Sequence, residues 1–449
     1  MPVSPLDPTV VEQEGHTAVL TWEASDQLTI KSISAVRNLK EDSQSNYAGV
    51  LYYNGLLDLS LMEQDQYSQE LQFIGSSQQI DWVTGLYYLK EDVNKVLQDS
   101  FSLDIFGIFG PPLSPIDPPT TFDALGSASF LVPRIVNAEA RSRAVYGQVS
   151  WVPNVFESRM ELTVGGRYTE DKKIASRLET TLSESRQDSE HLDASIALHY
   201  HWLDDLSTYV KWGTAYKAGG VNTRSASFSP FAEEVAKTWE IGLKSEFWDH
   251  RARFNIAVFT TDYEDMQLDF SDPVIVTLVE TINAAKTVEI SGAEIDVTLS
   301  PIMGLLVGLS YTYLDGDMPM QPNPLNGGVL KEFFVAQAPQ HAGAITVDYQ
   351  FAPRDYGVVA IHVDMTSTDH FAYVPFGEQR TDAYSLVNAR VELSGIDVGD
   401  GHLKASVWGK NIFDEEYIVY AFPVGDPAVS IGQAFGTPRT LGLDISYQF

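Results

Sequence analysis

The sequence lacks several features, and each absence excludes a class of protein. It has no cysteine, which excludes disulfide frameworks, thiolate metal sites and a cysteine nucleophile. No run of about 18 apolar residues occurs, so no transmembrane helix can be placed. Basic residues are scarce, because 29 Lys and Arg stand against 61 Asp and Glu, giving a net charge of -32. Nucleic acid requires a basic face, so we expect no nucleic-acid partner.

Catalytic and cofactor motifs are also missing from the sequence. No His is followed by Glu in a zinc-protease pattern, and no Gly-x-Ser-x-Gly elbow occurs. Gly219 and Gly220 precede no helical pattern that could present backbone amides to a phosphate. His199 and His201 share a strand face, but two His without a third ligand make a weak metal site. We predict no catalytic residue, no metal site, no cofactor and no enzymatic activity.

The clearest positive pattern is the last ten residues. Side chains of a strand alternate between two faces, and here one face is entirely apolar while the other is small or polar. The chain ends on an aromatic residue, as expected where barrel strands meet the membrane interface. This terminal strand resembles the assembly signal of bacterial outer-membrane proteins. Its apolar face consists of Leu441, Leu443, Ile445, Tyr447 and Phe449.

Alternating stretches recur along the whole chain, and short and long connections between them take turns. Transmembrane barrels show this rhythm, with short periplasmic turns and long extracellular loops. We predict an all-β, antiparallel transmembrane barrel of about seventeen strands. The expected strands are residues 16–24, 27–37, 67–74, 80–90, 141–152, 158–169, 192–202, 206–217, 237–248, 251–264, 281–300, 305–314, 341–351, 356–366, 383–393, 402–412 and 440–449. Long polar loops are expected at about 38–66, 91–137, 170–190, 218–235, 265–280, 315–340, 367–382 and 414–437.

The two faces of the predicted strands differ in the same way throughout. Trp239, Ile241 and Leu243 share one face, whereas Glu240 and Lys244 lie on the other. Charged residues along an entire face suit a water-filled lumen, because a dry core would leave them unpaired. A two-layer sandwich would bury the apolar face instead, and periodicity alone does not separate the two. Strand length and Tyr or Trp at strand ends favour the membrane.

Several segments together resemble TonB-dependent receptors of Gram-negative outer membranes. They are 162–171 (LTVGGRYTED), 215–222 (AYKAGGVN), 234–244 (EVAKTWEIGLK), 283–296 (NAAKTVEISGAEID) and 409–417 (GKNIFDEEY). The resemblance implies a plugged barrel of about 22 strands in the cell outer membrane. It also implies uptake of scarce nutrients, such as ferric siderophores, driven by the inner-membrane TonB complex. Outer-membrane lipid, lipopolysaccharide and the barrel-assembly machinery are the further partners implied.

The chain departs from that family at its beginning. The first residues, Met-Pro-Val-Ser-Pro, lack the basic and apolar regions of a signal peptide. No plug domain or TonB box is visible, so TonB is a partner only if both are encoded upstream. We therefore interpret residues 1–449 as one barrel domain lacking its plug and about five front strands. The alternatives are a plugless passive pore, an inert gene remnant, or a secreted β-sandwich adhesin.

Ligand contacts should come from the outward loops. Exposed loop aromatics mark binding surfaces, and arginines suit anionic groups. The candidates are Arg224, Phe228, Phe231, Phe333, Phe334, Phe371, Tyr373, Phe376, Arg380 and Tyr420.

Overall fold

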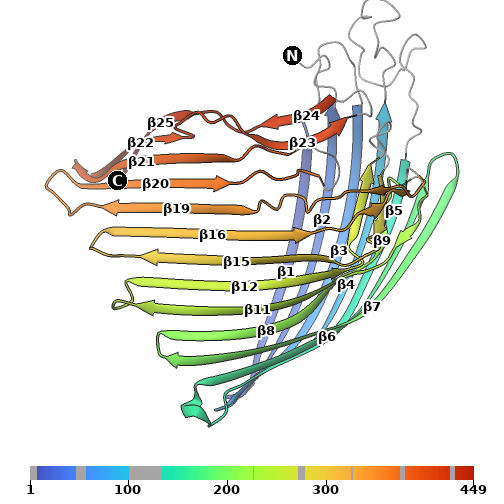
Figure 1. Cartoon of the computed structure of the whole chain (residues 1–449), viewed down its shortest axis with the longest axis horizontal. Helices are drawn as coiled ribbons and strands as arrows, with labels where there is room; N and C mark the ends of the chain where they lie inside the picture. Colours follow the sequence, from blue (N-terminus) through green and yellow to red (C-terminus); the bar gives the residue numbers. More distant parts are fainter. Residues whose placement is uncertain are drawn as a thin grey trace, which may run out of the picture.

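One antiparallel sheet of 17 strands dominates the computed structural model (Figure 1). The structure describes residues 8–46, 57–100, 134–225, 227–271, 279–324, 327–374, 380–424 and 430–449. The strands of this sheet are β1 (Val10–Ser25), β2 (Leu28–Asn46), β3 (Leu57–Ser76), β4 (Ile80–Ser100), β5 (Arg134–Trp151), β6 (Met160–Leu178), β7 (Leu182–Leu203), β8 (Leu206–Lys217), β11 (Glu234–Phe247), β12 (Ala252–Glu264), β15 (Val288–Leu299), β16 (Leu305–Asp317), β19 (His341–Gln350), β20 (Val358–Thr368), β21 (Tyr384–Val398), β22 (Gly401–Lys410) and β25 (Thr440–Gln448). The predicted strand number is confirmed.

The sheet is a meander in which each strand pairs with its neighbours along the chain. β8 pairs with β11, for example, and β22 pairs with β25, always antiparallel. Figure 1 shows strong curvature, with β1 to β7 running steeply and β15 to β25 lying across the view. Within the described residues, β1 pairs only with β2 and β25 only with β22. In Figure 1 the C-terminus lies at the end of the sheet that carries short turns such as β7–β8 and β11–β12, and the long connections lie at the other end together with the short β6–β7 turn.

Side-chain exposure follows the predicted alternation. Trp239, Ile241 and Val258 lie side by side on one face and are 56%, 60% and 48% exposed. On the opposite face, the Tyr209 hydroxyl donates a hydrogen bond of 2.7 Å to the Glu240 carboxylate. The described sheet is one layer deep, so the apolar rows are not sandwiched against another sheet. Apolar rows of this extent require an apolar solvent, as lipid provides.

Three predicted loops are wrong in their extent. The first is shortened because β2 reaches Asn46 and β3 begins at Leu57. Residues 170–190 were expected to be a loop, but β6 continues to Leu178 and β7 begins at Leu182. The ladder persists because backbone pairing does not depend on an apolar face once the strands rise beyond the lipid. The longest predicted loop is shortened in the same way, since β4 reaches Ser100 and β5 begins at Arg134.

One predicted strand is divided. Residues 281–300 fall into β14 (Val279–Asn283) and β15, which belong to different sheets. Four small hairpins of this kind lie at the long-loop end of the sheet, within the described residues. The other hairpin strands are β9 (Gly220–Val221), β10 (Pro230–Phe231), β13 (Gln267–Ser271), β17 (Gln321–Pro322), β18 (Leu330–Lys331), β23 (Ile418–Val424) and β24 (Ser430–Phe435).

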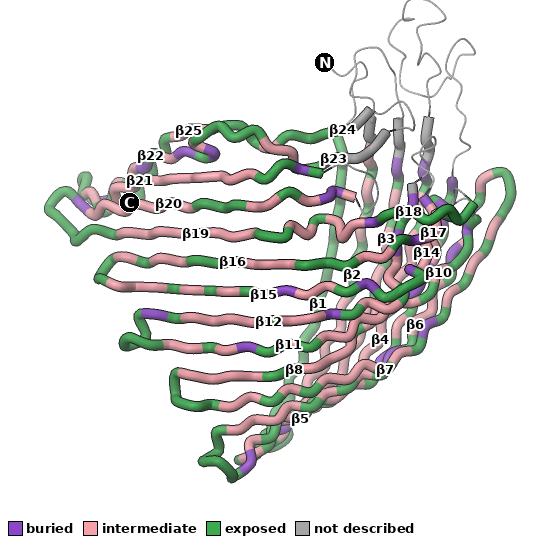
Figure 2. Tube along the Cα trace, viewed as in Figure 1, coloured by how far each residue is buried: buried purple, intermediate pink, exposed green. Residues whose placement is uncertain are grey.

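A small apolar core lies among these hairpins and against the first residue of β15. Its buried members are Leu268, Phe270, Ala284, Val288 and Phe333. The Phe270 and Phe333 rings are 4.6 Å apart. Figure 2 shows buried residues at the same end, around β10, β14, β17 and β18. Among the described residues, part of the long connections therefore folds into a packed cap. No helix in the described ranges is long and apolar enough to cross a membrane.

Candidate functional site

The first loop cluster joins residues 222–233 to the β13–β14 hairpin. Asn283 connects the two segments, because its Oδ1 accepts a hydrogen bond from the Ala232 backbone amide at 2.7 Å. Its Nδ2 donates to the carbonyls of Ala232, Glu233 and Asp265. Gln267 acts similarly, donating to the carbonyls of Ala218 and Ala232. Two side-chain amides thus supply the bonds that a regular ladder provides elsewhere.

A carboxylate fixes the other end of this cluster. Glu280 on β14 accepts hydrogen bonds from the Ser225 hydroxyl at 2.8 Å, the Ser227 hydroxyl at 2.9 Å and the Ser227 amide at 2.9 Å. Arg177 of β6, itself buried, donates to the carbonyls of Thr223 and Ser225. Since these bonds come from β6 and β14 together, the 222–233 segment is held in one position over the sheet.

The 222–233 segment leaves an open pocket beside β14. The pocket has a volume of about 380 Å³ and opens among the loops at the long-loop end of the sheet. Its walls combine apolar groups with polar groups that mostly bond to the protein itself. They comprise Ser227, Ser229, Pro230, Phe231, Glu280, Thr281, Ile282, Asn283 and Pro324.

The second loop cluster lies around residues 333–337, 371–374, 380–381 and 417–420. The Arg380 guanidinium lies over the Phe334 ring, 4.5 Å from its centre. The Phe371 and Tyr373 rings meet edge to face at 5.2 Å. The Tyr373 hydroxyl donates to the Ile418 carbonyl, and burial raises the pKa of Tyr373 to about 12. This phenol therefore stays protonated and acts as a donor throughout the physiological pH range.

The structure divides the predicted ligand residues between these clusters. Phe228, Phe333 and Tyr373 are only 5%, 2% and 4% exposed, so their rings contact protein. Phe228, for instance, lies under the Arg177 guanidinium at 4.7 Å. The remaining residues reach the surface to different degrees. Phe231 lines the pocket and is half-buried, as are Phe334 and Phe371, whereas Arg224, Arg380 and Tyr420 are exposed. Phe376 lies outside the described residues, and the ligand role of the whole set stays a prediction.

Sequence reasoning missed the residues that organise the loops, namely Glu280, Asn283 and Arg177. Each carries a polar side chain whose partners are backbone groups distant in sequence. The one local signal is Asn283, an amide placed where β14 ends, because Asn is favoured at turns. Glu280 and Arg177 lie in alternating strands, as many solvent-exposed polar residues do, so the alternation pattern did not distinguish them from such residues.

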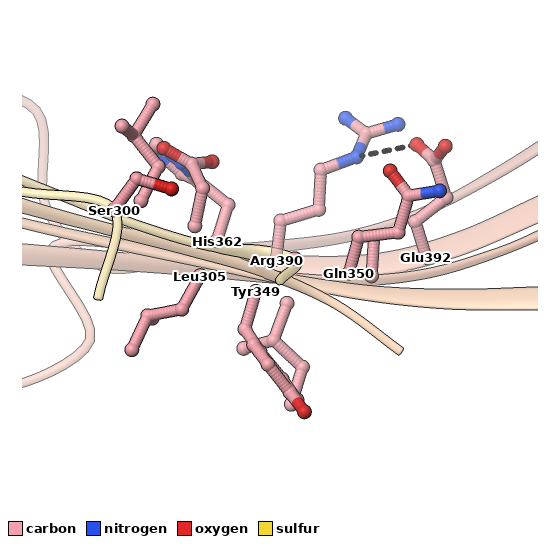
Figure 3. A pocket seen from close by; sticks show the side chains of 12 residues that line it. Ser300, Leu305, Tyr349, Gln350, His362, Arg390 and Glu392 are labelled. Atoms are coloured by element: carbon pink, nitrogen blue, oxygen red, sulfur yellow. Dashed lines mark hydrogen bonds and ion pairs between the residues drawn. The ribbon is translucent and has the colours of Figure 1, made fainter. Parts of the chain in front are cut away.

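The sheet itself offers a polar wall at its short-turn end (Figure 3). In this view His362, Arg390 and Glu392 rise from one face, while Leu305 and Tyr349 extend from the other. His362 bonds to Asp348 at 2.7 Å and to Asp364 at 3.2 Å. Arg390 pairs with Glu392 at 3.5 Å and with Asp444 at 3.3 Å. Charges on one face and apolar groups on the other are what a lumen wall in lipid requires.

The predicted His pair lies among aromatic rings on β7 and β8. His199 stacks on Tyr209 with ring centres 5.3 Å apart, and it shares the polar face of β7 with His201. The neighbouring Tyr200 and Trp202 meet at 4.6 Å. Across the part of the chain that the structure describes, no group of three His, Cys, Asp or Glu is arranged to hold a metal ion.

The fold and the loops together define a class: an outer-membrane β-barrel wall with a polar lumen face and a structured cap of extracellular loops. The chain belongs to the TonB-dependent receptor-like β-barrel family, whose model matches residues 5–412. It is therefore a protein of the Gram-negative outer membrane, and the named relatives that it resembles are receptors and transporters.

Curated relatives agree with this family. The chain is 24% identical over 249 residues to the ferric-pyoverdine M114 receptor PbuA of Pseudomonas sp. (strain M114), which covers 55% of the chain and 28% of the relative. It is 21% identical over 345 residues to the ferrichrome outer membrane transporter/phage receptor of Escherichia coli (strain K12), covering 76% and 43%. The chain thus spans less than half the length of these curated relatives.

Solved structures show the same fold. The ferric yersiniabactin uptake receptor FyuA from Yersinia pestis superposes with a TM-score of 0.75 at 17% identity, covering 98% of this chain and 62% of that one. The ferric preacinetobactin receptor BauA from Acinetobacter baumannii gives 0.69 at 16%, covering 98% and 63%. These likenesses establish the barrel architecture.

Proposed function

We propose that this chain is the barrel portion of a TonB-dependent outer-membrane receptor that takes up ferric-siderophore-type iron complexes. One observation carries the proposal. The described parts of the long loops form two hydrogen-bonded clusters, one held by Asn283 and Glu280 and the other held in part by Tyr373. Fixed loops reduce the ordering cost of binding a scarce ligand. The printed names of its relatives, receptors for ferric pyoverdine and ferrichrome, support iron complexes as the ligand class.

The partners follow from the same proposal. Membrane lipid contacts the apolar rows, exemplified by Trp239 and Ile241, and lipopolysaccharide surrounds the long loops. The barrel-assembly machinery recognises the terminal strand from Leu441 to Phe449. TonB is a partner of the complete protein, provided that a plug and a TonB box are encoded upstream of residue 1.

Growth on defined iron sources tests the proposal. Deleting the complete gene from its host should abolish growth on at least one ferric siderophore supplied as the sole iron source. Restoring the gene should restore that growth, because uptake of such a complex across the outer membrane needs a specific receptor. A matched strain supplied with excess inorganic iron controls for general fitness. Unchanged growth and unchanged ⁵⁵Fe uptake with every ferric siderophore supplied would refute the proposal.

A further inference from the structure

Four basic residues gather on one face of β4, β5 and β6, although the chain carries a net charge of -32. Lys90 lies opposite Arg141 in the β4–β5 ladder, and Arg141 lies opposite Lys172 in the β5–β6 ladder. Arg143 projects from the same face as Arg141, two residues away on β5. The three strands run side by side in the steep part of the sheet (Figure 1). We call these four residues the basic cluster.

The basic cluster shares its face with the apolar rows of the same strands. Side chains alternate along a strand, so Arg143 projects to the same side as Val145, and Lys172 to the same side as Val164. Both valines are exposed, and the β5–β6 ladder keeps one register throughout. The cluster therefore points toward the surrounding membrane and not into the lumen.

The position along each strand places the cluster at the edge of the hydrocarbon layer. A barrel strand crosses this layer in about 9–11 residues. Counted from Trp151, where β5 meets its short turn, Arg143 is the ninth residue and Arg141 the eleventh. Lys90 is the eleventh residue of β4, counted from Ile80. Long loops are extracellular in such barrels, so the cluster lies at the headgroup level of the outer leaflet.

Two of the four cations are paired within the sheet. Lys90 pairs with Asp92 at 2.7 Å and with Glu139 at 3.8 Å. Glu139 also pairs with Arg141, at 2.7 Å. These two carboxylates offset the repulsion that like charges on neighbouring strands would otherwise cause.

The other two cations, Arg143 and Lys172, make no ion pair within 4.0 Å in the part of the chain that the structure describes. Glu170 lies opposite Arg143, but its carboxylate accepts a hydrogen bond from a tyrosine hydroxyl at 3.4 Å. Asp188 lies opposite Lys172, and its carboxylate accepts from the Arg186 guanidinium at 2.9 Å. Arg143 and Lys172 thus present donors to the membrane on either side of the paired Arg141.

From this arrangement we infer that the basic cluster binds a glycolipid of the outer leaflet through two phosphate groups, as the lipid A part of lipopolysaccharide carries them. The inference gives the lipopolysaccharide contact proposed above a place on the barrel, and it rests on that proposal. Arginine and lysine form short, charge-assisted hydrogen bonds to phosphate oxygens. Neighbouring strands are about 4.8 Å apart, so the cluster spans about 10 Å from β4 to β6. Two phosphates on one headgroup suit that width better than the single phosphate of a phospholipid.

Lys172 and Lys173 provide a matched pair of variants for the test. They are consecutive residues of β6, so the first faces the membrane and the second faces the lumen. Lys172→Gln removes a cation from the basic cluster, and Lys173→Gln removes the same charge from the opposite face. The double variant R143Q/K172Q removes both cations that make no ion pair in the described sheet, and it leaves the pairs of Glu139 intact.

The experiment measures lipid binding to the receptor made from the complete gene and purified in detergent. Native mass spectrometry gives the dissociation constants of bisphosphorylated lipid A, of the same lipid after removal of both phosphates, and of phosphatidylglycerol. We expect the wild type to bind bisphosphorylated lipid A at least tenfold more tightly than either other lipid. K172Q should weaken that binding at least fivefold and R143Q/K172Q at least twentyfold, whereas K173Q should stay within twofold of the wild type.

Three results would overturn the inference. Equal binding of dephosphorylated lipid A, or equal effects of K172Q and K173Q, would show that the cluster is not a phosphate site. Phosphatidylglycerol that binds as tightly as lipid A would exclude the selection of a glycolipid. Growth on ferric siderophores is measured separately, so either the lipid site or the iron-uptake function can fail while the other stands. Heat-dependent gel migration of each variant confirms that the barrel has assembled before binding is compared.

Discussion

At the scale of single residues, side-chain amides hydrogen-bond to backbone groups of the loops and so hold the loop segments together. Asn411 repeats the arrangement of Asn283: its Nδ2 donates to the carbonyls of Glu415 and Thr437, and its Oδ1 accepts from the Glu415 amide. Gln321, completely buried, accepts from the Ala285 amide. These residues satisfy backbone groups where no neighbouring strand is available, which is why the loops adopt one conformation.

Replacing Asn283 should loosen one loop cluster and leave the barrel intact. Asn283→Ala removes one acceptor and a donor that reaches three carbonyls. At about 1 kcal/mol per net hydrogen bond, the local loss is roughly 2–4 kcal/mol. Hydrogen exchange should quicken in residues 230–234 and 265–268 but not in the β11–β12 ladder. Asn283→Asp keeps the acceptor but turns a carboxylate oxygen toward three carbonyl oxygens, so it should loosen the cluster at least as much as Asn283→Ala does. Uniform exchange across the sheet would contradict the local role.

His250 should titrate at unusually high pH. It lies in the β11–β12 turn, and its hydrogen bond to the Glu246 carboxylate at 2.8 Å raises its pKa above the ordinary value near 6.5. The resulting stabilisation is complete below the ordinary pKa and is lost as pH rises through the raised one. NMR of labelled His in micelles measures the shift. Glu246→Gln should return the His250 pKa toward its ordinary value, and no change would show that another charge sets it.

At the scale of strands, period-two alternation identified nearly every element of the sheet. The pattern worked where one face meets lipid, as along β11, because burial in lipid selects apolar residues at every second position. It failed beyond the lipid, where β6 and β7 continue as a hairpin with polar residues on both faces. It also failed at Thr281–Asn283, where it predicted one strand with β15. The short strand β14 of the loop cap has the same alternation as the strand that follows it.

Period-two alternation could not predict the loop clusters either. Their contacts join residues far apart in sequence, such as Ser227 with Glu280 or Tyr373 with Ile418. The aromatic composition of the loops predicted an interaction surface, but it did not distinguish a ring that packs in the cap, such as Phe333, from one that lines a pocket, such as Phe231. Only the three-dimensional arrangement separates them.

The two faces of β15 should respond oppositely to a lysine. Ile295 lies on the apolar face with Ile256, and Asp296 lies on the polar face beside Asn255. Ile295→Lys places a charge in lipid and should destabilise the barrel by about 2–4 kcal/mol if it lies near the midplane. Asp296→Lys keeps a charge in water and should cost much less. Urea unfolding in lipid vesicles measures both. Equal losses would indicate that the apolar face is not in lipid.

At the scale of the whole molecule, the apolar face of the sheet continues to the last residue. Leu441, Leu443 and Ile445 are 73%, 65% and 66% exposed along β25, and Phe449 is 98% exposed. β25 pairs with β22 over nine residue positions, from Lys410 with Thr440 to His402 with Gln448. Phe449 lies beyond this ladder, so its ring adds little to the energy of the folded sheet. Its exposure instead suits recognition during assembly.

Removing the Phe449 ring should therefore impair assembly more than stability. If the terminal strand is the assembly signal proposed above, Phe449→Ala in the complete receptor should lower its amount in the outer membrane several-fold. The fraction that does assemble should show the wild-type urea midpoint, since the β22–β25 ladder is unchanged. Val407→Ala on β22, an exposed apolar position of the same face, serves as the matched control. Quantitative outer-membrane fractionation and urea unfolding give both values. A lowered midpoint with normal abundance would make Phe449 a structural residue and remove it from the assembly signal.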